Sequence, residues 1–312
     1  MSSLALRGLG IIIVLISHLP NSFLPTGGVN FFFLITGIVF LSKTNEYIFS
    51  IKEIKNFFKK RYLKIYPSII FISILTIFFY IIFGKLDNPT LVINTFLATL
   101  IAYDNYFFLF NEINYFDEFN VNVFQHFWAF SIIFQFYVFV YFFGKFLAGN
   151  KSVLLITTII LTLYHLMSYF FNFTIIPENY INNLDLYYFY SLDQRLWIFF
   201  LGGVIARFDL SIINKFFFPV TIFCIFALMN FNNFIIINLI YILVFITFYN
   251  LQKNYFNLNK LLEFIGNYSY QIYCCFFPIY YFIDLYFLNF YFSLLAKILL
   301  ITLFVKLLKY IK

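Results

Sequence analysis

The chain has 312 residues, of which 63% are hydrophobic and 11% charged, with a formal net charge of +7. Ordinary soluble domains are about 45–50% apolar and about 25% charged. This high apolar fraction excludes a soluble enzyme and a disordered chain. The net positive charge does not indicate a nucleic-acid-binding module, because the basic residues lie in short segments between apolar runs. The composition predicts an all-α, polytopic membrane protein.

Apolar runs recur along the whole chain. A spanning helix needs about 20 apolar residues, and its backbone groups must be paired internally. The length therefore predicts about ten transmembrane helices in one bundle, with residues 1–312 as a single integral-membrane domain and no room for a soluble one. The expected spans are 5–23, 29–43, 65–84, 124–146, 152–171, 194–208, 216–231, 233–250, 266–286 and 289–308.

The distribution of charge predicts the orientation. A basic cluster between Lys43 and Lys64 follows the second span, so this loop is expected in the cytoplasm. The apolar segment 91–110 contains Asp104, and if it does not cross, the later basic loops fall inside and the acidic ones outside. We therefore expect 91–110 to be interfacial or re-entrant, with both termini cytoplasmic. A composition rich in Phe, Ile, Asn, Lys and Tyr is typical of AT-rich bacterial genomes, which favours the bacterial inner membrane.

The first span carries two ionisable residues, Arg7 and His18. They are eleven residues apart, close to three helical turns, which places them on one helix face about 16 Å apart. The arginine can reach the cytoplasmic interface, and a lone histidine in a span is more often a packing residue. An ionisable group inside a membrane is nevertheless a candidate functional group, and histidine is the usual general base near neutral pH.

Five further motifs follow, each with a structural and a functional interpretation. Gly28 to Gly37, with Asn30 between them, permits close helix packing. The basic run 59–67 around Arg61 is either a membrane anchor or a site for a phosphorylated ligand. Aromatic side chains beside the remaining polar groups are typical of the membrane interface. These motifs are His126-Phe127-Trp128, Arg195-Leu196-Trp197 and Ser269-Tyr270-Gln271-Ile272-Tyr273. The three cysteines lack metal-ligand spacing, so no metal is expected, and His165 and Lys297 are interpreted as structural.

The order of these motifs along nearly the whole chain resembles the acyltransferase 3 family of membrane O-acyltransferases. The spacing from Arg7 to His18 and from Gly28 to Gly37 carries most of the resemblance. The resemblance implies transfer of an acyl group, by default acetyl, from cytoplasmic acetyl-CoA to a hydroxyl of a surface polysaccharide, lipopolysaccharide or peptidoglycan. Expected partners are therefore acyl-CoA, a surface glycan and membrane lipid, and no nucleic acid.

The resemblance also implies roles for the site residues. His18 acts as general base or transient acyl carrier, and Arg7 and Arg61 hold CoA phosphates at the cytoplasmic end. Arg195 orients the acceptor or stabilises negative charge that develops on the carbonyl oxygen. The remaining substrate-binding candidates are His126, Trp128, Asn30 and Tyr273.

The chain departs from the family pattern at three places. An acidic residue expected after the tryptophan is replaced at Ile133 or Phe134, an Asp is replaced by Asn30, and a His before the last proline is replaced by Phe276. A carboxylate that orients the catalytic histidine is therefore missing or supplied elsewhere, and His126 is a substitute if it folds close to His18.

Two other functions fit an all-helical membrane protein. A polysaccharide polymerase would carry a large outer loop with several arginines, whereas the outer loops expected here are acidic. A flippase or other transporter would show internal repeats and interrupted helices at matching positions, which the sequence lacks. The acceptor, the acyl group and the oligomeric state are not encoded in any motif.

Overall fold

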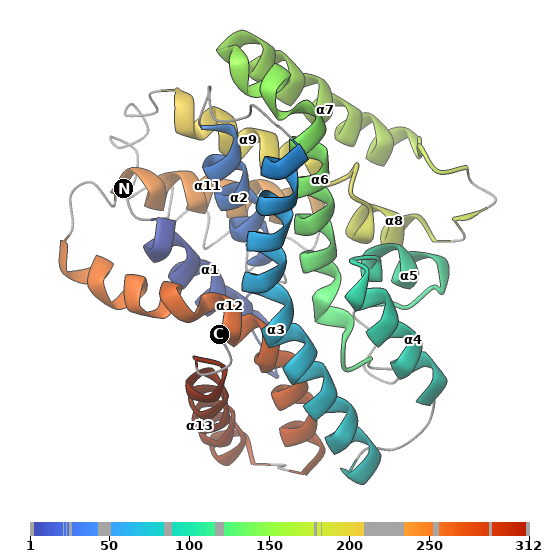
Figure 1. Ribbon diagram of the computed structural model, residues 1–312, viewed down its shortest axis with the longest axis vertical. Helices are drawn as coiled ribbons and strands as arrows, with labels where there is room; N and C mark the ends of the chain where they lie inside the picture. The colour runs from blue at the N-terminus through green and yellow to red at the C-terminus, as the bar shows by residue number, and fades with distance from the viewer. Residues whose placement is uncertain are drawn as a thin grey trace. The chain divides into compact units, whose positions relative to one another are not determined.

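In the computed structural model, every regular element among the described residues is a helix. The described residues are 3–20, 22, 24, 27–42, 51–83, 89–115, 122–177, 180–181, 183–208, 234–251, 256–286 and 289–309. The all-α fold class is thereby confirmed, and the expected span 216–231 lies outside the described residues. Figure 1 shows the helices, which are α1 (Ser3–Ser17), α2 (Val29–Leu41), α3 (Ile51–Phe83), α4 (Pro89–Leu100), α5 (Asp104–Phe110), the 3₁₀ helix η1 (Gln125–Phe127), α6 (Trp128–Gly149), α7 (Lys151–Phe171), α8 (Leu184–Tyr190), α9 (Leu196–Arg207), α11 (Phe234–Leu251), α12 (Phe256–Tyr286) and α13 (Phe290–Lys309).

Four segments of the described chain are long and apolar enough to cross a membrane, judged by length and composition. They are Asn56–Phe83, Gln125–Gly144, Lys151–Phe171 and Phe290–Leu308. Other apolar helices are shorter: α9 has 12 residues, about 18 Å, against a hydrocarbon core of about 30 Å. The structure thus has several apolar helices, and the expected total of about ten spans stays a prediction.

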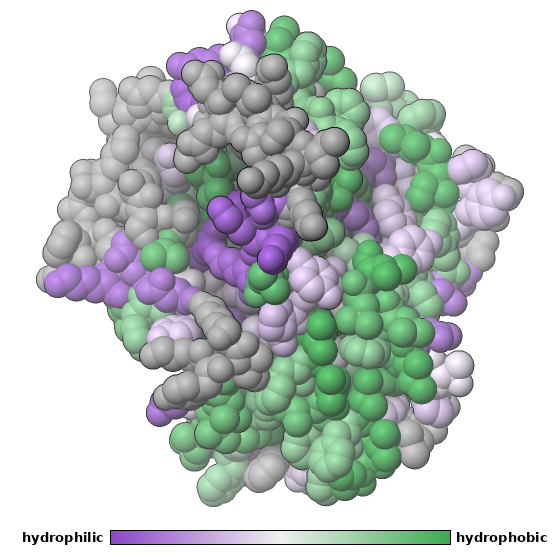
Figure 2. Space-filling view, in the orientation of Figure 1, coloured by the Kyte–Doolittle hydropathy of each residue, from purple (hydrophilic) through white to green (hydrophobic). Residues whose placement is uncertain are grey.

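Helix α3 begins earlier than the sequence analysis expected. The basic run was expected as a loop, with Pro67 in the first turn of a span, but the helix is continuous from Ile51 and contains Pro67 in its interior. No glycine or earlier proline interrupts residues 51–66, and Lys, Arg, Leu and Ile all tolerate a helix. Figure 2 shows hydrophilic surface over the N-terminal part of α3 and hydrophobic surface along its C-terminal half.

The segment 91–110 is not one continuous helix, and its expected interfacial or re-entrant position stays a prediction. It forms α4 and α5, which have 12 and 7 residues and are separated by a turn in which Ala102 has a φ of 55°. Of the three polar residues that stand out in this apolar segment, Asp104 and Asn105 are buried at the turn, whereas Asn94 on α4 is exposed.

The chain divides into two compact units. Unit 1 contains α1, α2, α9, α11, α12 up to Ser269, α6 from Phe142 and α7 up to Thr162. Helix α2 lies at its centre and contacts α1, α9 and α11 (Figure 1). The rings of Phe33 and Phe199, both fully buried, lie 4.9 Å apart between α2 and α9.

Glycines bring two helix pairs of unit 1 into backbone contact. A Cβ at Gly37 of α2 would lie 1.8 Å from the Phe199 carbonyl oxygen, and one at Gly202 of α9 would lie 2.2 Å from that of Leu34. Helices α1 and α12 repeat the arrangement. A Cβ at Gly8 would lie 2.1 Å from the Leu262 oxygen, and one at Gly266 would lie 1.8 Å from that of Leu4. Small residues at such crossings let apolar helices gain close van der Waals contact.

Unit 2 contains α3, α4, α5, η1, α6 up to Tyr141, α7 from Leu163, α8, α12 from Tyr270 and α13. Polar networks as well as apolar packing hold it together. The structure gives partners to both residues interpreted as structural: His165 Nδ1 lies 2.7 Å from Gln194 Oε1, and Lys297 Nζ lies 2.6 Å from Asp284 Oδ1.

The ion pair between α12 and α13 provides a test of this packing. Lys297 is 1% exposed, and Asp284, 41% exposed, is its carboxylate partner. We expect Asp284→Asn to lower the free energy of unfolding by about 2 kcal/mol, because it leaves the buried ammonium group of Lys297 without its counter-charge. The loss is smaller than for a fully buried pair, because solvent already screens Asp284. Thermal unfolding in detergent measures this change. The double variant Asp284→Asn, Lys297→Met should recover most of the loss, and a double variant no more stable than the single one would contradict the argument.

Candidate active site

His18 follows the last residue of α1. The helix was expected to continue to residue 23, but it ends at Ser17 and His18 lies in the turn beyond it, half-buried. The turn sits close to the helix, because the Leu19 N–H donates to the Ile16 carbonyl oxygen at 3.0 Å. Pro20 follows and prevents the helix from continuing.

The imidazole of His18 is oriented by the backbone of its own helix. Nδ1 lies 2.7 Å from the carbonyl oxygen of Val14, and the hydroxyl of Ser17 lies 3.3 Å from the same nitrogen. A carbonyl oxygen only accepts, so Nδ1 carries the proton in this arrangement. The lone pair is then on Nε2, which is the tautomer that a general base requires.

Arg7 lies on α1, half-buried, eleven residues before His18, which stands one position beyond the end of that helix. From Arg7 to the helix end at Ser17 the axis rises by about 15 Å. Asn30, the third candidate in unit 1, is fully buried at the start of α2 and donates from Nδ2 to Asn238 Oδ1 on α11 at 2.7 Å. The amide therefore joins two helices of this unit.

Arg61 lies in unit 2 on the basic part of α3. Its guanidinium carbon is 5.1 Å from the centre of the Phe57 ring and 5.9 Å from that of Tyr137 on α6. Lys59, Lys60 and Lys64 are exposed on the same stretch of helix. A stacked guanidinium beside three exposed ammonium groups suits a phosphorylated ligand.

His126 and Tyr273 are in direct contact in the core of unit 2. His126 Nε2 lies 3.2 Å from the carbonyl oxygen of Cys274, and the Tyr273 hydroxyl donates to the His126 carbonyl oxygen at 2.8 Å. The imidazole also stacks on Phe277, with ring centres 5.3 Å apart. His126 is fully buried. It thus lies in unit 2 whereas His18 lies in unit 1, and its role as a substitute orienting group stays a prediction.

Arg195 and Trp128 form the second contact between predicted residues. Arg195 is 2% exposed and donates from Nε and Nη2 to the Phe189 carbonyl oxygen at 3.2 and 2.8 Å. Its guanidinium carbon lies 5.4 Å from the centre of the Trp128 ring. Trp128 and Arg195, distant in sequence, therefore meet in unit 2, and the arginine is held by backbone and ring rather than directed to solvent.

An acidic residue on a neighbouring helix borders the motif after the tryptophan. Ile133 and Phe134 are apolar positions of α6, but Ser131, two residues before Ile133, donates to Asp104 Oδ2 on α5 at 3.1 Å. From the sequence, Asp104 was expected only to prevent the segment 91–110 from spanning the membrane. The feature in the sequence that could have identified Asp104 is an acidic residue within an apolar run, because a buried ionisable group is a candidate functional residue.

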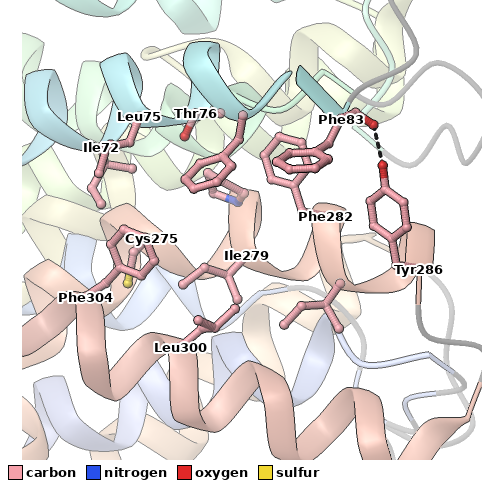
Figure 3. A pocket seen from close by; sticks show the side chains of 13 residues that line it. Ile72, Leu75, Thr76, Phe83, Cys275, Ile279, Phe282, Tyr286, Leu300 and Phe304 are labelled. Carbon is pink, nitrogen blue, oxygen red and sulfur yellow. Dashed lines mark hydrogen bonds between the residues drawn. The ribbon is translucent and has the colours of Figure 1, made fainter. Parts of the chain in front are cut away.

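A separate apolar groove of about 400 Å³ lies between α3, α12 and α13 in unit 2. Figure 3 shows its lining, from Ile72, Cys275 and Phe304 at one end to Phe83 and Tyr286 at the other. The Tyr286 hydroxyl donates to the Phe83 carbonyl oxygen at 2.7 Å and ties two of these helices together. The lining suits hydrocarbon and not the phosphates of CoA, and of the described residues none of the predicted site residues lines it.

These features define an all-helical protein with several apolar helices and ionisable residues placed among them. The comparisons with known proteins then give the family: the acyltransferase domain of the acyltransferase 3 family matches residues 5–311, so the chain belongs to that family. This confirms the resemblance inferred from the motif order.

Curated relatives match part of the chain. The O-acetyltransferase OatA of Staphylococcus aureus, strains NCTC 8325 and COL, is 29% identical over 140 residues, which is 43% of this chain and 23% of the relative. A protein of strain N315, provisionally named as an O-acetyltransferase, is 28% identical over 138 residues with the same coverage. The matched part of the chain thus spans about a quarter of the length of these relatives. No solved structure matches the chain significantly.

Proposed function

We propose that the protein is a membrane O-acyltransferase that moves an acyl group, by default acetyl, from cytoplasmic acyl-CoA to a hydroxyl of a cell-surface glycan. The observation that carries the proposal is the family match over residues 5–311. Relatives named as O-acetyltransferases, OatA among them, favour acetyl transfer to oxygen. A polymerase or transporter would not be expected to match this family over its whole length.

His18 is the proposed general base. Its Nε2 takes the proton of the acceptor hydroxyl while that oxygen attacks the acyl carbonyl carbon, and the CoA thiolate leaves. The contact of Nδ1 with Val14 supports this role, because it sets the tautomer and stabilises the imidazolium that forms. Arg7, Arg61 and the lysines near Arg61 are proposed to hold the phosphates of the donor.

Arg195, Trp128, His126, Tyr273 and Asn30 are proposed to shape the acceptor side. The buried contacts of Arg195 with Phe189 and Trp128 support a role in which the arginine fixes the wall of the site. The location proposed is the bacterial inner membrane with both termini in the cytoplasm, for which the basic α3 segment and the acidic loops of the sequence are the support.

The function is tested by mass spectrometry of the surface glycan from cells with and without the gene, complemented by the wild-type gene. The expected result is the loss of one acetyl mass per modified sugar at unchanged chain length, restored on complementation. Shortened chains with unchanged acetylation would contradict acyl transfer and favour polymerisation or export.

A further inference from the structure

Asp104 is a buried acid that the proposed mechanism does not use. It is the first residue of α5 and is 0% exposed. Among the described residues, no basic group lies within ion-pair distance of Asp104, in contrast to Asp284, which pairs with Lys297. A carboxylate buried without a cation is costly, so the group is expected to be neutral or to serve a function.

One side of this carboxyl group is held by α6. Ser131 donates to Asp104 Oδ2 at 3.1 Å and accepts from the Asp104 N–H at 3.3 Å. One turn further along α6, Gln135 donates to the Ala102 carbonyl oxygen at 2.9 Å and to Asn105 Oδ1 at 2.8 Å. Ser131 and Gln135 together therefore hold the turn between α4 and α5, where Ala102 has its positive φ.

The other oxygen, Oδ1, is buried and has no hydrogen-bond partner among the described residues. The hydroxyl of Thr99 lies nearby but donates its proton to the Thr95 carbonyl oxygen at 2.9 Å. On α3, Tyr66 is close enough to Asp104 for an electrostatic interaction. Tyr66 also packs edge-to-face against Phe134 of α6, with ring centres 5.8 Å apart.

These contacts place Asp104 where the basic segment of α3 meets α6. Tyr66 stands five residues after Arg61 on α3, and the guanidinium of Arg61 lies over Tyr137. Tyr137 is six residues after Ser131 on α6. A shift of the turn or of α6 at Ser131 would thus displace the ring on which Arg61 rests.

We propose that Asp104 is a positioning residue that acts through Arg61: as a neutral carboxyl group it fixes α6 against the α4–α5 turn, so that Tyr137 and α3 hold Arg61 in place for the acyl donor. This inference rests on the proposed function, which assigns the donor phosphates to Arg61. Ionisation of Asp104 places a buried negative charge at the junction and loosens it.

Burial favours the neutral form of the Asp104 carboxyl group at pH values below about 7. Helix α5 lies outside the four segments long enough to cross a membrane, and desolvation by burial raises the pKa of Asp104 from 3.8 to about 7, against the opposing effect of the Thr99 and Ser131 hydroxyls. Of the described side chains, those that face it are Tyr66 from α3, Thr99 from α4 and Ser131 from α6. Only the tyrosine titrates, and a tyrosine hydroxyl is neutral at pH 7.

The first test compares Asp104→Asn with Asp104→Ala in the full-length protein in detergent. Asparagine stays neutral and can accept from Ser131, so it should keep the affinity for acetyl-CoA near wild type at pH 6.5. Alanine removes the contact and should raise the KM for acetyl-CoA about tenfold with a smaller change in kcat. In the wild type, KM should rise as the pH passes about 7, and Asp104→Asn should abolish that rise.

The matched control is Asp185→Asn, which removes an exposed acid from the first turn of α8. It should leave both KM and its pH dependence unchanged. If Asp104→Asn shows the same rise of KM above pH 7 as the wild type, the proposed role of the Asp104 proton is wrong.

A double-mutant cycle with Arg61→Ala tests the route of the effect. If Asp104 acts through Arg61, Asp104→Ala should change the dissociation constant of acetyl-CoA in the wild-type background but not in the Arg61→Ala background. Equal effects in both backgrounds would overturn the inference. A wild-type protein that binds acetyl-CoA but transfers no acyl group would instead contradict the proposed function and leave this binding cycle interpretable.

Discussion

Replacing His18 by alanine is expected to lower acetyl transfer about 10²- to 10⁴-fold, the usual contribution of a general base. The imidazole is the group that the proposed mechanism needs at the acceptor hydroxyl, and its Nδ1 is already engaged with Val14 at 2.7 Å. The measurement is the rate of CoA thiol release on addition of acetyl-CoA and acceptor glycan. Membrane insertion and thermal stability of the variant are checked in parallel.

Ser17→Ala is the matched control for this variant. The Ser17 hydroxyl lies 3.3 Å from the same imidazole nitrogen but also donates to the Val14 carbonyl oxygen at 3.0 Å, so its removal leaves the contact between His18 and Val14 in place. We expect a change of less than about threefold, because the tautomer is retained. If His18→Ala transfers acetyl groups about as fast as Ser17→Ala, His18 is not part of the mechanism.

Gly37→Ala is expected to destabilise the protein by about 3 kcal/mol or more. The added methyl carbon would lie 1.8 Å from the Phe199 carbonyl oxygen, which is backbone and has no rotamer by which to move away. Helices α2 and α9 would have to separate, and the contact between Phe33 and Phe199 would be lost with them. Thermal unfolding in detergent, followed by loss of the monodisperse peak on size-exclusion chromatography, measures the effect.

Gly149→Ala provides the comparison within the same protein. Gly149 is the last residue of α6, and a Cβ there would meet no atom within 4 Å. Alanine suits a helix better than glycine, so the expected change lies between none and a gain of about 0.5 kcal/mol. If both glycine variants unfold at the same temperature, the α2–α9 crossing is looser than the structure indicates.

Part of the fold, and the family, could be predicted from the sequence, whereas the roles of the candidate site residues stay predictions. Apolar runs predicted the helices, and the motif order predicted the family that the match over residues 5–311 confirms. The start of α3 was misjudged because charge was taken as the end of a span, whereas basic residues continue a helix readily.

The remaining features depend on contacts between distant residues, which a single sequence does not display. Trp128 and Arg195 meet because the turn after α8 folds onto the start of α6. No local sequence pattern predicts this contact. Asp104 and Ser131 are 27 residues apart, so the acid that borders the motif could not be identified by spacing within it. The division of the predicted residues between two units was likewise not visible in their order.

The contact between Val14 and His18 has a consequence for how such an enzyme tolerates change. In many hydrolases the group that steers the histidine is a side chain, and its loss by mutation cripples the enzyme. Here the atom that orients the imidazole is the main-chain carbonyl oxygen of Val14. Any residue at position 14 that preserves the helix therefore preserves this hydrogen bond. The informative substitution at this contact is therefore one that distorts the last turn of α1, and not a change of the Val14 side chain.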